Sequence, residues 1–336
     1  MNDWEVLNTV PKLPQNVTPI SYTGLRYLSE CPLRFIFSRD NRYPHKTNPR
    51  ARMGSAFHVT LAFIIKNESA NLQEVIDCFE YELKKQRAVA ILNYRERILP
   101  WPKDLRENME NALAVRFTTM SRGKISGIKY NIETTLLSAD RLLIGRPDAV
   151  FITPEGPIIV DYKTGHFNNL NIDIYEDQIC FYSGLWEELY NELPKLGRIE
   201  FILDGYVHEI FIDANRCRSM LLDARKLSAS IDKLVLVLSA SYGEHCRLCN
   251  YRPWCQEYWD SKETERDLEG SICAEHNRDS QSFCLQTRAS HVSIINRTPV
   301  PLPEWQYGTF IRILDLVGNG SVRHTSLYSE IFKVVK

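Results

Sequence analysis

The stretch GPIIVDYKTG, residues 156–165, decides the fold expected for this chain. It begins as an apolar run, typical of a buried strand, and then continues into Asp161, Tyr162 and Lys163. Because side chains alternate along a strand, Asp161 and Lys163 lie on the same face. A carboxylate and an ammonium therefore share one site at the strand end. Taken alone, the pair is more simply interpreted as a surface ion pair, so the residues around it must decide.

The segments around this strand predict the fold class. Helical patterns recur in six places: 21–39, 52–67, 71–95, 103–121, 173–191 and 214–240. Three β-rich runs between residues 128 and 163 predict a meander, and two further strands are expected over 198–213. This order predicts an α/β core with a mixed sheet flanked by helices.

Composition indicates an ordinary soluble protein, with 336 residues, 44% apolar content and 25% charge. The first residues lack a signal-peptide pattern, and no apolar run approaches the roughly 18 residues that a membrane span needs. A cytoplasmic location without a membrane partner is expected. The net charge of -1 gives no overall attraction to nucleic acid, so any such contact must come from a local basic cluster.

One basic cluster stands out, RFIFSRDNRYPHKTNPRAR at residues 34–52, with Asp40 as its single acid. It is interpreted either as a solvated loop or as a segment that holds DNA phosphates. In the second interpretation the contacts come from five cations: Arg39, Arg42, Lys46, Arg50 and Arg52.

A second carboxylate, Asp148, lies in GRPDAVF on the β-rich run before residue 156, 13 residues before Asp161. If the two strands pair through the PEG turn, Asp148 and Asp161 converge on one metal ion. Two carboxylates suit Mg²⁺ or Mn²⁺. Lys163 could then orient or deprotonate an attacking water and offset charge on the phosphate.

Two helices supply further candidates. His58, in GSAFH, could complete the metal shell, although a lone histidine on an apolar helix is more often a core or surface residue. Gln178 and Tyr182 share one face of the helix that follows the strand. Their spacing alone means little.

The four motifs occur in the order G-x-x-x-H, G-x-x-D, D-x-K-T-G and Q-x-x-x-Y. Over roughly residues 20–260 this order resembles the RecB-type nuclease family of the PD-(D/E)xK superfamily, which implies a restriction-endonuclease-like core. The resemblance also implies a role for each matched side chain: His58, Asp148 and Asp161 bind the catalytic metal, Lys163 assists water attack, and Gln178 and Tyr182 contact the DNA strand.

The cysteines of CRLCNYRPWC, Cys246, Cys249 and Cys255, leave one position of a four-ligand site unfilled. Their spacing suits zinc as well as iron. The iron-sulfur branch of the same family has one Cys-Pro before the nuclease core and three cysteines after it. This branch includes AddB-type nuclease domains, and CRISPR-associated RecB-like exonucleases are similar. The resemblance therefore implies a [4Fe-4S] cluster with Cys31 as its fourth ligand.

The other cysteines fit no metal pattern. Cys78, Cys180 and Cys217 are predicted to be buried small apolar residues, and no role is assigned to Cys273 and Cys284. An odd total of nine cysteines without a secretion signal disfavours a disulfide framework.

Three segments are predicted: a nuclease core with the cluster at 1–262, a linker at 263–284 and a small β-rich module at 285–336. The module loosely resembles an OB-type barrel that could stack DNA bases, and a partner-docking domain or a simple packing extension is an equal alternative. Its candidate base contacts are Trp305, Tyr307, Phe310, Arg312, Arg323 and His324.

The resulting hypothesis is a metal-dependent DNA exonuclease that acts on single-stranded ends and carries a structural [4Fe-4S] cluster. The alternatives are a structure-specific or duplex endonuclease and a non-catalytic, cluster-bearing DNA-binding subunit. No G-x-x-x-x-G-K-[ST] motif occurs, so no ATP motor is expected. A helicase or another repair, recombination or defence protein would then be a separate partner.

Overall fold

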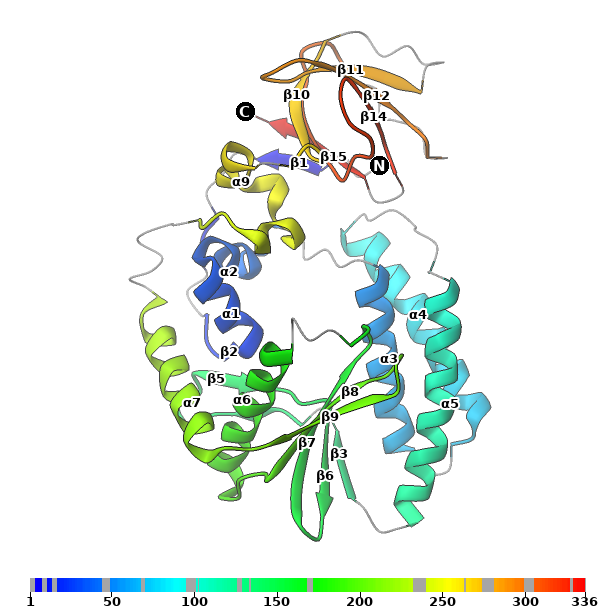
Figure 1. Ribbon diagram of the computed structural model, residues 1–336, viewed down its shortest axis with the longest axis vertical. Helices are drawn as coiled ribbons and strands as arrows, with labels where there is room; N and C mark the ends of the chain where they lie inside the picture. Colours follow the sequence, from blue (N-terminus) through cyan, green and yellow to red (C-terminus); the bar gives the residue numbers. More distant parts are fainter. Residues whose placement is uncertain are drawn as a thin grey trace.

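The chain forms a central mixed sheet and a second sheet, joined by a cysteine-bearing segment (Figure 1). The computed structural model describes residues 4–7, 11–13, 17–43, 49–67, 70–94, 101, 103–125, 129–132, 134–167, 172–231, 240–262, 264–273, 281–298, 305–326 and 329–335. Within these residues, no helix has the length and apolar character that a membrane span requires.

The central sheet contains β3 (Lys129–Ile132), β6 (Ala149–Thr153), β7 (Gly156–Lys163), β8 (Leu196–Phe201) and β9 (Tyr206–Phe211), in that spatial order. Strands β7 and β8 pair in parallel and are connected by helix α6 (Ile172–Tyr190), whereas the other neighbours are antiparallel. The predicted mixed α/β core is confirmed.

The predicted meander is present only in part. Strands β4 (Leu136–Leu137) and β5 (Leu143–Gly145) leave the central sheet and pair with β2 (Ile20–Ser21) in a separate three-stranded sheet. Strand β3 consequently pairs with β6 directly. The sequence pattern did not indicate this division because both sheets need similar short apolar runs.

Helices cover both faces of the central sheet (Figure 1). On one face, α3 (Pro49–Lys66), α4 (Leu72–Tyr94) and α5 (Lys103–Ile125) form an apolar core with Val160 and Tyr162 of β7. On the other face, α6 and α7 (Ala214–Ala229) pack on the alternate β7 residue Ile159. The alternation places Asp161 and Lys163 on the α6 side. The helix expected over 214–240 ends at Ala229, and residues 232–239 lie outside the described part of the chain.

The single helix predicted over 21–39 is wrong, because two helices meet at Cys31. Helix α1 (Tyr22–Glu30) ends there and α2 (Pro32–Arg39) begins there, with Cys31 in an extended conformation at φ −159° and ψ 100°. Proline disfavours helical geometry in the residue before it. Pro32 therefore breaks the helix and turns Cys31 out of the helical path.

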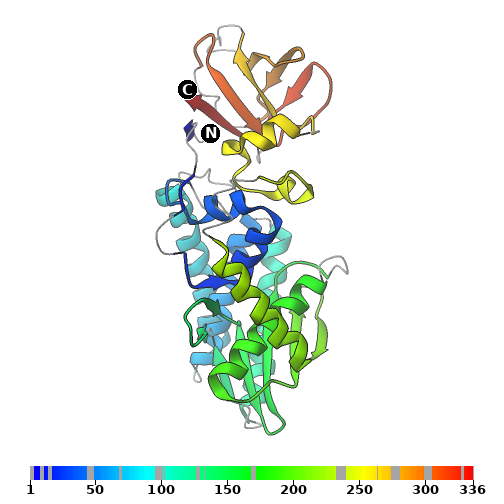
Figure 2. The same cartoon turned by 90° about the vertical axis from the view of Figure 1, so that its left-hand side faces the viewer.

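The second sheet has the order β1-β15-β13-β10-β11-β12-β14 and lies at one end of the molecule (Figure 2). Its strands are β1 (Trp4–Leu7), β10 (Leu268–Ile272), β11 (Ser282–Gln286), β12 (His291–Ile295), β13 (Phe310–Leu314), β14 (Val322–His324) and β15 (Glu330–Val335). Strand β10 and most of β11 fall within the expected linker 263–284, so that expectation is wrong there. Strand β1 pairs in parallel with β15, which brings the two chain ends together.

The segment between the two sheets is short and irregular. It contains the 3-10 helices η2 (Glu244–Leu248) and η3 (Arg252–Trp254), followed by α9 (Gln256–Ser261). It carries Cys246, Cys249 and Cys255.

Candidate active site and cysteine cavity

Gly54 allows α3 to approach the end of β7. A Cβ atom built on Gly54 would lie 2.7 Å from Oγ1 of Thr164, which is closer than real Cβ atoms approach. Residues four apart lie on the same face of a helix, so this contact also brings His58 to the strand end. The G-x-x-x-H spacing is thus explained by close packing of helix on strand.

Gly145 has the same role for α6. A Cβ atom on Gly145 would lie 2.8 Å from Cδ1 of Tyr182. Only a glycine lets the Q-x-x-x-Y face of α6 come so close to the strand that leads into Asp148.

The pairing of β6 with β7 brings the two carboxylates together. Ala149 is opposite Val160, so Asp148 and Asp161 lie beside each other at the end of the ladder. The backbone N–H of Tyr162 donates a 2.7 Å hydrogen bond to Oδ2 of Asp148 and fixes that carboxylate.

Each carboxylate also faces a cationic group. Nδ1 of His58 lies 3.0 Å from Oδ1 of Asp148, and Nζ of Lys163 lies 2.6 Å from Oδ2 of Asp161. Burial, together with the nearby Asp148 charge, raises the pKa of Asp161 although the Lys163 ammonium opposes the shift. Burial alone would lower the pKa of His58, but the Asp148 and Asp161 carboxylates outweigh it and raise that pKa.

The Lys163 ammonium is held from the α6 side. Its Nζ donates to Oε1 of Gln178 at 3.0 Å and lies 4.2 Å from the ring centroid of Tyr175. The side-chain amide of Gln178 in turn donates to the hydroxyl of Tyr182 at 2.7 Å. The two residues predicted to contact DNA therefore also position Lys163.

These side chains line an open cavity of about 360 Å³. Further side chains to which the sequence assigned no role also line it, among them Arg146, His166 and Tyr175. Arg146 lies inside the G-x-x-D motif, so its position next to Asp148 was the available signal.

The donors present suit a hard divalent cation, since one imidazole and two carboxylates converge on the cavity. Nδ1 of His58 and Oδ2 of Asp161 are buried and make no well-directed hydrogen bond, despite their ion-pair contacts. Among the described residues no group of three or more His, Cys, Asp or Glu side chains has the arrangement of a metal centre. The carboxylates instead face His58 and Lys163.

The predicted phosphate-binding cations are found in different environments. Arg39 lines a second cavity of about 390 Å³ together with Lys12. Burial lowers the pKa of Arg39, and no carboxylate in the described part of the chain pairs with it. Arg42 instead binds Asp40, with Nε 2.9 Å from Oδ1.

The remaining three predicted phosphate-binding cations differ in how exposed they are or lie outside the described residues. Arg50 is exposed on the first turn of α3, and Lys46 lies outside the described residues. Arg52 is only 5% exposed, and this burial argues against a phosphate contact.

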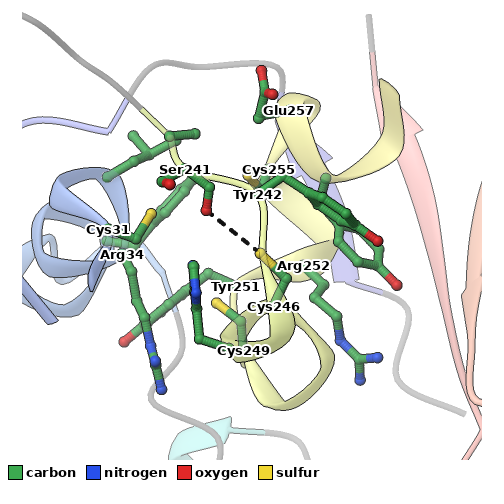
Figure 3. Close-up of a pocket in the computed structure, with 15 residues that line it drawn as sticks. Cys31, Arg34, Ser241, Tyr242, Cys246, Cys249, Tyr251, Arg252, Cys255 and Glu257 are labelled. Carbon is green, nitrogen blue, oxygen red and sulfur yellow. Dashed lines mark hydrogen bonds between the residues drawn. The ribbon is translucent and has the colours of Figure 1, made fainter. Parts of the chain in front are cut away.

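The four predicted cluster cysteines line one small cavity of about 20 Å³ (Figure 3). Cys31 enters from the corner between α1 and α2, and Cys246, Cys249 and Cys255 come from the segment after α7. All four are free thiols. Burial and the neighbouring cysteines raise the pKa of Cys255 to about 12.

This cavity has packed aromatic walls. The ring of Phe37 in α2 stacks on Tyr251 with the centroids 5.3 Å apart and the planes 10° apart. On the opposite side, Cys246 and Cys255 pack against a cluster that includes Trp259 and Phe332. The cysteine segment therefore lies between the N-terminal helices and the second sheet.

The other cysteines agree only in part with expectation. Cys180 and Cys217 are buried as predicted, whereas Cys78 is only half-buried. Cys273 and Cys284, to which no role was assigned, form a disulfide beside the paired strands β10 and β11.

Several residues expected to stack DNA bases are instead inside the second sheet. Trp305, Arg312 and Arg323 are buried, and Nη2 of Arg323 donates to Glu265 at 2.8 Å. Tyr307 is exposed. Burial of both arginines argues against their predicted base contacts.

Comparison with known proteins adds one result. A family model described as "PD-(D/E)XK nuclease superfamily" matches residues 19–256. No curated protein matches the chain. A solved structure described as "Crystal structure of SSO0001" is similar over 51% of this chain and 80% of its own, at 15% identity. Its TM-score of 0.29 is too low to carry an argument.

Proposed function

The chain belongs to the PD-(D/E)XK nuclease superfamily, and from this premise we propose that it is a metal-dependent exonuclease acting on single-stranded DNA ends. The observation that carries the proposal is the pairing of His58 with Asp148 and of Asp161 with Lys163 in one open cavity. Acids, imidazole and ammonium at that spacing suit phosphodiester hydrolysis by water.

Mg²⁺ or Mn²⁺ would be held by His58, Asp148 and Asp161. Once bound, the ion would acidify a water ligand and offset negative charge on the phosphate. Lys163 contributes an ammonium whose position is fixed by Gln178 and Tyr175, so it can stabilise charge that develops on the phosphate oxygens. Tyr162 keeps Asp148 oriented through its backbone N–H.

Positively charged side chains near this cavity are expected to guide the DNA backbone toward it. Arg39 is half-buried beside a cavity, and the Asp40 carboxylate of that cavity is paired with Arg42, so Arg39 is available to a backbone phosphate. Single-strand preference and exonuclease action are supported by the order of the four motifs, which resembles RecB-type nucleases. Because the sequence has no ATP motor motif, a helicase would act as a separate cytoplasmic partner.

The cysteine cavity is proposed to hold a structural [4Fe-4S] cluster. Four free thiols from two distant segments line one cavity, and thiolates are the ligands that iron-sulfur clusters use. Iron and sulfide found in anaerobically purified protein would support the cluster. Zinc without iron would overturn the choice of metal but leave the four-cysteine site in place.

Three substrates test the catalytic proposal: end-labelled single strands, the matching duplex and closed circular single strands, each with Mn²⁺. We expect shortening of the linear single strand, slower attack on the duplex and no attack on the circle. Cutting of the circle would identify an endonuclease. DNA binding without any cleavage would identify a non-catalytic subunit.

A further inference from the structure

Arg312 of β13 is a buried cation that joins the second sheet to the cysteine segment. Its side chain is surrounded by acceptors although the residue is only 4% exposed. Nη1 donates to the backbone oxygen of Pro253 at 2.7 Å, and Nη2 donates to Oε1 of Gln256 at 2.9 Å. Nε donates to Oε2 of Glu269 at 3.0 Å. All three sides of the guanidinium are thereby satisfied.

The first two of these contacts enclose one cysteine. Pro253 and Gln256 stand on either side of Cys255 in the chain, where η3 ends and α9 begins. No side chain caps α9 at Cys255. Arg312 therefore holds the turn in place through its two hydrogen bonds from the second sheet.

The same face of the sheet holds the segment at further points. Arg252 pairs with Asp267 at 3.0 Å and with Asp315 at 3.2 Å. Nε1 of Trp259 donates to the backbone oxygen of Arg252 at 2.8 Å, and the Arg312 guanidinium lies 5.0 Å from the Trp259 ring centroid. Because Asp267 and Asp315 flank β10 and β13, these contacts attach the segment to the sheet rather than to the nuclease core.

We propose that Arg312 is the positioning residue of Cys255: it fixes the turn that presents the Cys255 thiol to the cysteine cavity. The second sheet is then a structural part of the cysteine site. The inference rests on the proposed metal-binding function of that cavity. A metal site needs its ligands held in a fixed geometry, and the planar guanidinium fork holds both sides of the Cys255 turn at once.

The test compares Arg312→Gln, Arg312→Lys and the matched control Arg323→Gln in the full-length chain. Arg323 is also 4% exposed in the same sheet, but its partner is Glu265. Anaerobically purified proteins are treated with iodoacetamide without denaturant, and the alkylation of each cysteine is followed by peptide mass spectrometry. Iron, sulfide and zinc per chain are measured on the same samples.

In Arg312→Gln we expect Cys255 to be alkylated about tenfold faster, which corresponds to local opening made easier by about 1.4 kcal/mol. Metal content falls, and the rate at Cys78 stays at the wild-type value. Arg312→Lys keeps the charge but loses the planar fork, so its effect on Cys255 is smaller and in the same direction. Arg323→Gln leaves Cys255 unchanged.

Two results overturn the positioning role: a wild-type Cys255 rate in Arg312→Gln, or equal acceleration of every cysteine in both Gln variants. If Arg312→Gln does not fold, selective labelling of Cys255 in Arg312→Lys decides the question. Wild-type protein without iron or zinc would instead refute the proposed metal site. In that case, selective labelling of Cys255 would still show whether Arg312 positions this cysteine. Failure of the metal site and failure of the positioning role are therefore distinguishable.

Discussion

The catalytic cavity and the cysteine cavity are built on opposite plans. The first collects charged side chains from neighbouring strands and the helices packed on them, and each carboxylate faces a cation in the protein itself. The second collects four thiols from distant segments held by short helical turns. In the proposed function a bound metal would neutralise the four thiolates, which would otherwise repel one another. The comparison implies that the candidate active site is assembled by folding alone, whereas the proposed metal would help to complete the fold around the cysteine cavity.

The largest expected effect comes from removing the distant thiol, Cys31→Ala. Cys31 and Cys246 are roughly 215 residues apart, and by chain entropy a link closing so long a loop contributes about 5 kcal/mol. Since that approaches the whole stability of many domains, the variant should lose its metal, become protease-sensitive and lose nuclease activity. Urea unfolding measures the change, with Cys78→Ala as the control. A metal-loaded, fully stable Cys31→Ala protein would contradict the contrast between the two cavities.

Asp161→Ala should affect the candidate active site without affecting the cysteine cavity. Loss of a central charged group costs cleavage on the order of 10³-fold, but the fold and the metal content of the cysteine site should persist. DNA binding should persist as well, because the carboxylate opposes the phosphates. Single-turnover cleavage and iron analysis test this, with Glu209→Gln in β9 as a control carboxylate of the same sheet. If the Asp161→Ala variant cleaved DNA at the wild-type rate, Asp161 would have no catalytic role.

A smaller effect is expected from Gln178, which contacts Lys163 rather than the proposed metal. Gln178→Ala should lower kcat by about 10- to 100-fold, as loss of a supporting hydrogen bond does in other sites. Gln178→Glu keeps an acceptor for Lys163 but places a negative charge near DNA, so it should raise KM more than it lowers kcat. An equal effect of both variants on KM alone would leave Gln178 with a DNA contact and no role in positioning Lys163.

The smallest effect concerns the approach of DNA. Arg39→Gln should weaken single-strand binding and reduce the slope of log K against log salt by about 0.7, the value for one lost phosphate contact. Fluorescence anisotropy over a salt series measures the slope. Arg42→Gln is the control, because Arg42 is engaged with Asp40. Equal slopes for wild type and Arg39→Gln would show that Arg39 makes no phosphate contact. They would favour the interpretation of the basic stretch as solvated.

Sequence patterns predicted the mixed α/β core and the motifs whose side chains meet in the candidate active site, since these motifs have local causes. Gly54 and Gly145 mark close approaches of helix to strand, and the residues after them follow at helix and strand spacing. The break at Cys31 was also readable, because Pro32 follows it, yet the periodicity of the surrounding helix concealed it. The prediction of one helix over 21–39 was therefore wrong although its local signal, Pro32, was present.

The second sheet could not be predicted in the same way. Its first strand in space, β1, and its central strand β10 come from opposite ends of the chain, and neither has a pattern that names its partner. Arg312 and Arg323 were predicted to contact DNA because the module loosely resembles an OB-type barrel, in which arginines can stack on bases. Their burial depends on acceptors such as Glu269 and Glu265, which only the fold brings into reach.

The parallel pairing of β1 with β15 has a consequence for how the protein is made. Residues 4–7 leave the ribosome long before residues 330–335, and at cellular rates of synthesis the delay is on the order of tens of seconds. During that time β1 has no partner in its sheet, and the face that supports Cys255 is incomplete. Metal loading should therefore follow translation, and nascent chains stalled before β15 should accumulate as metal-free targets for proteases.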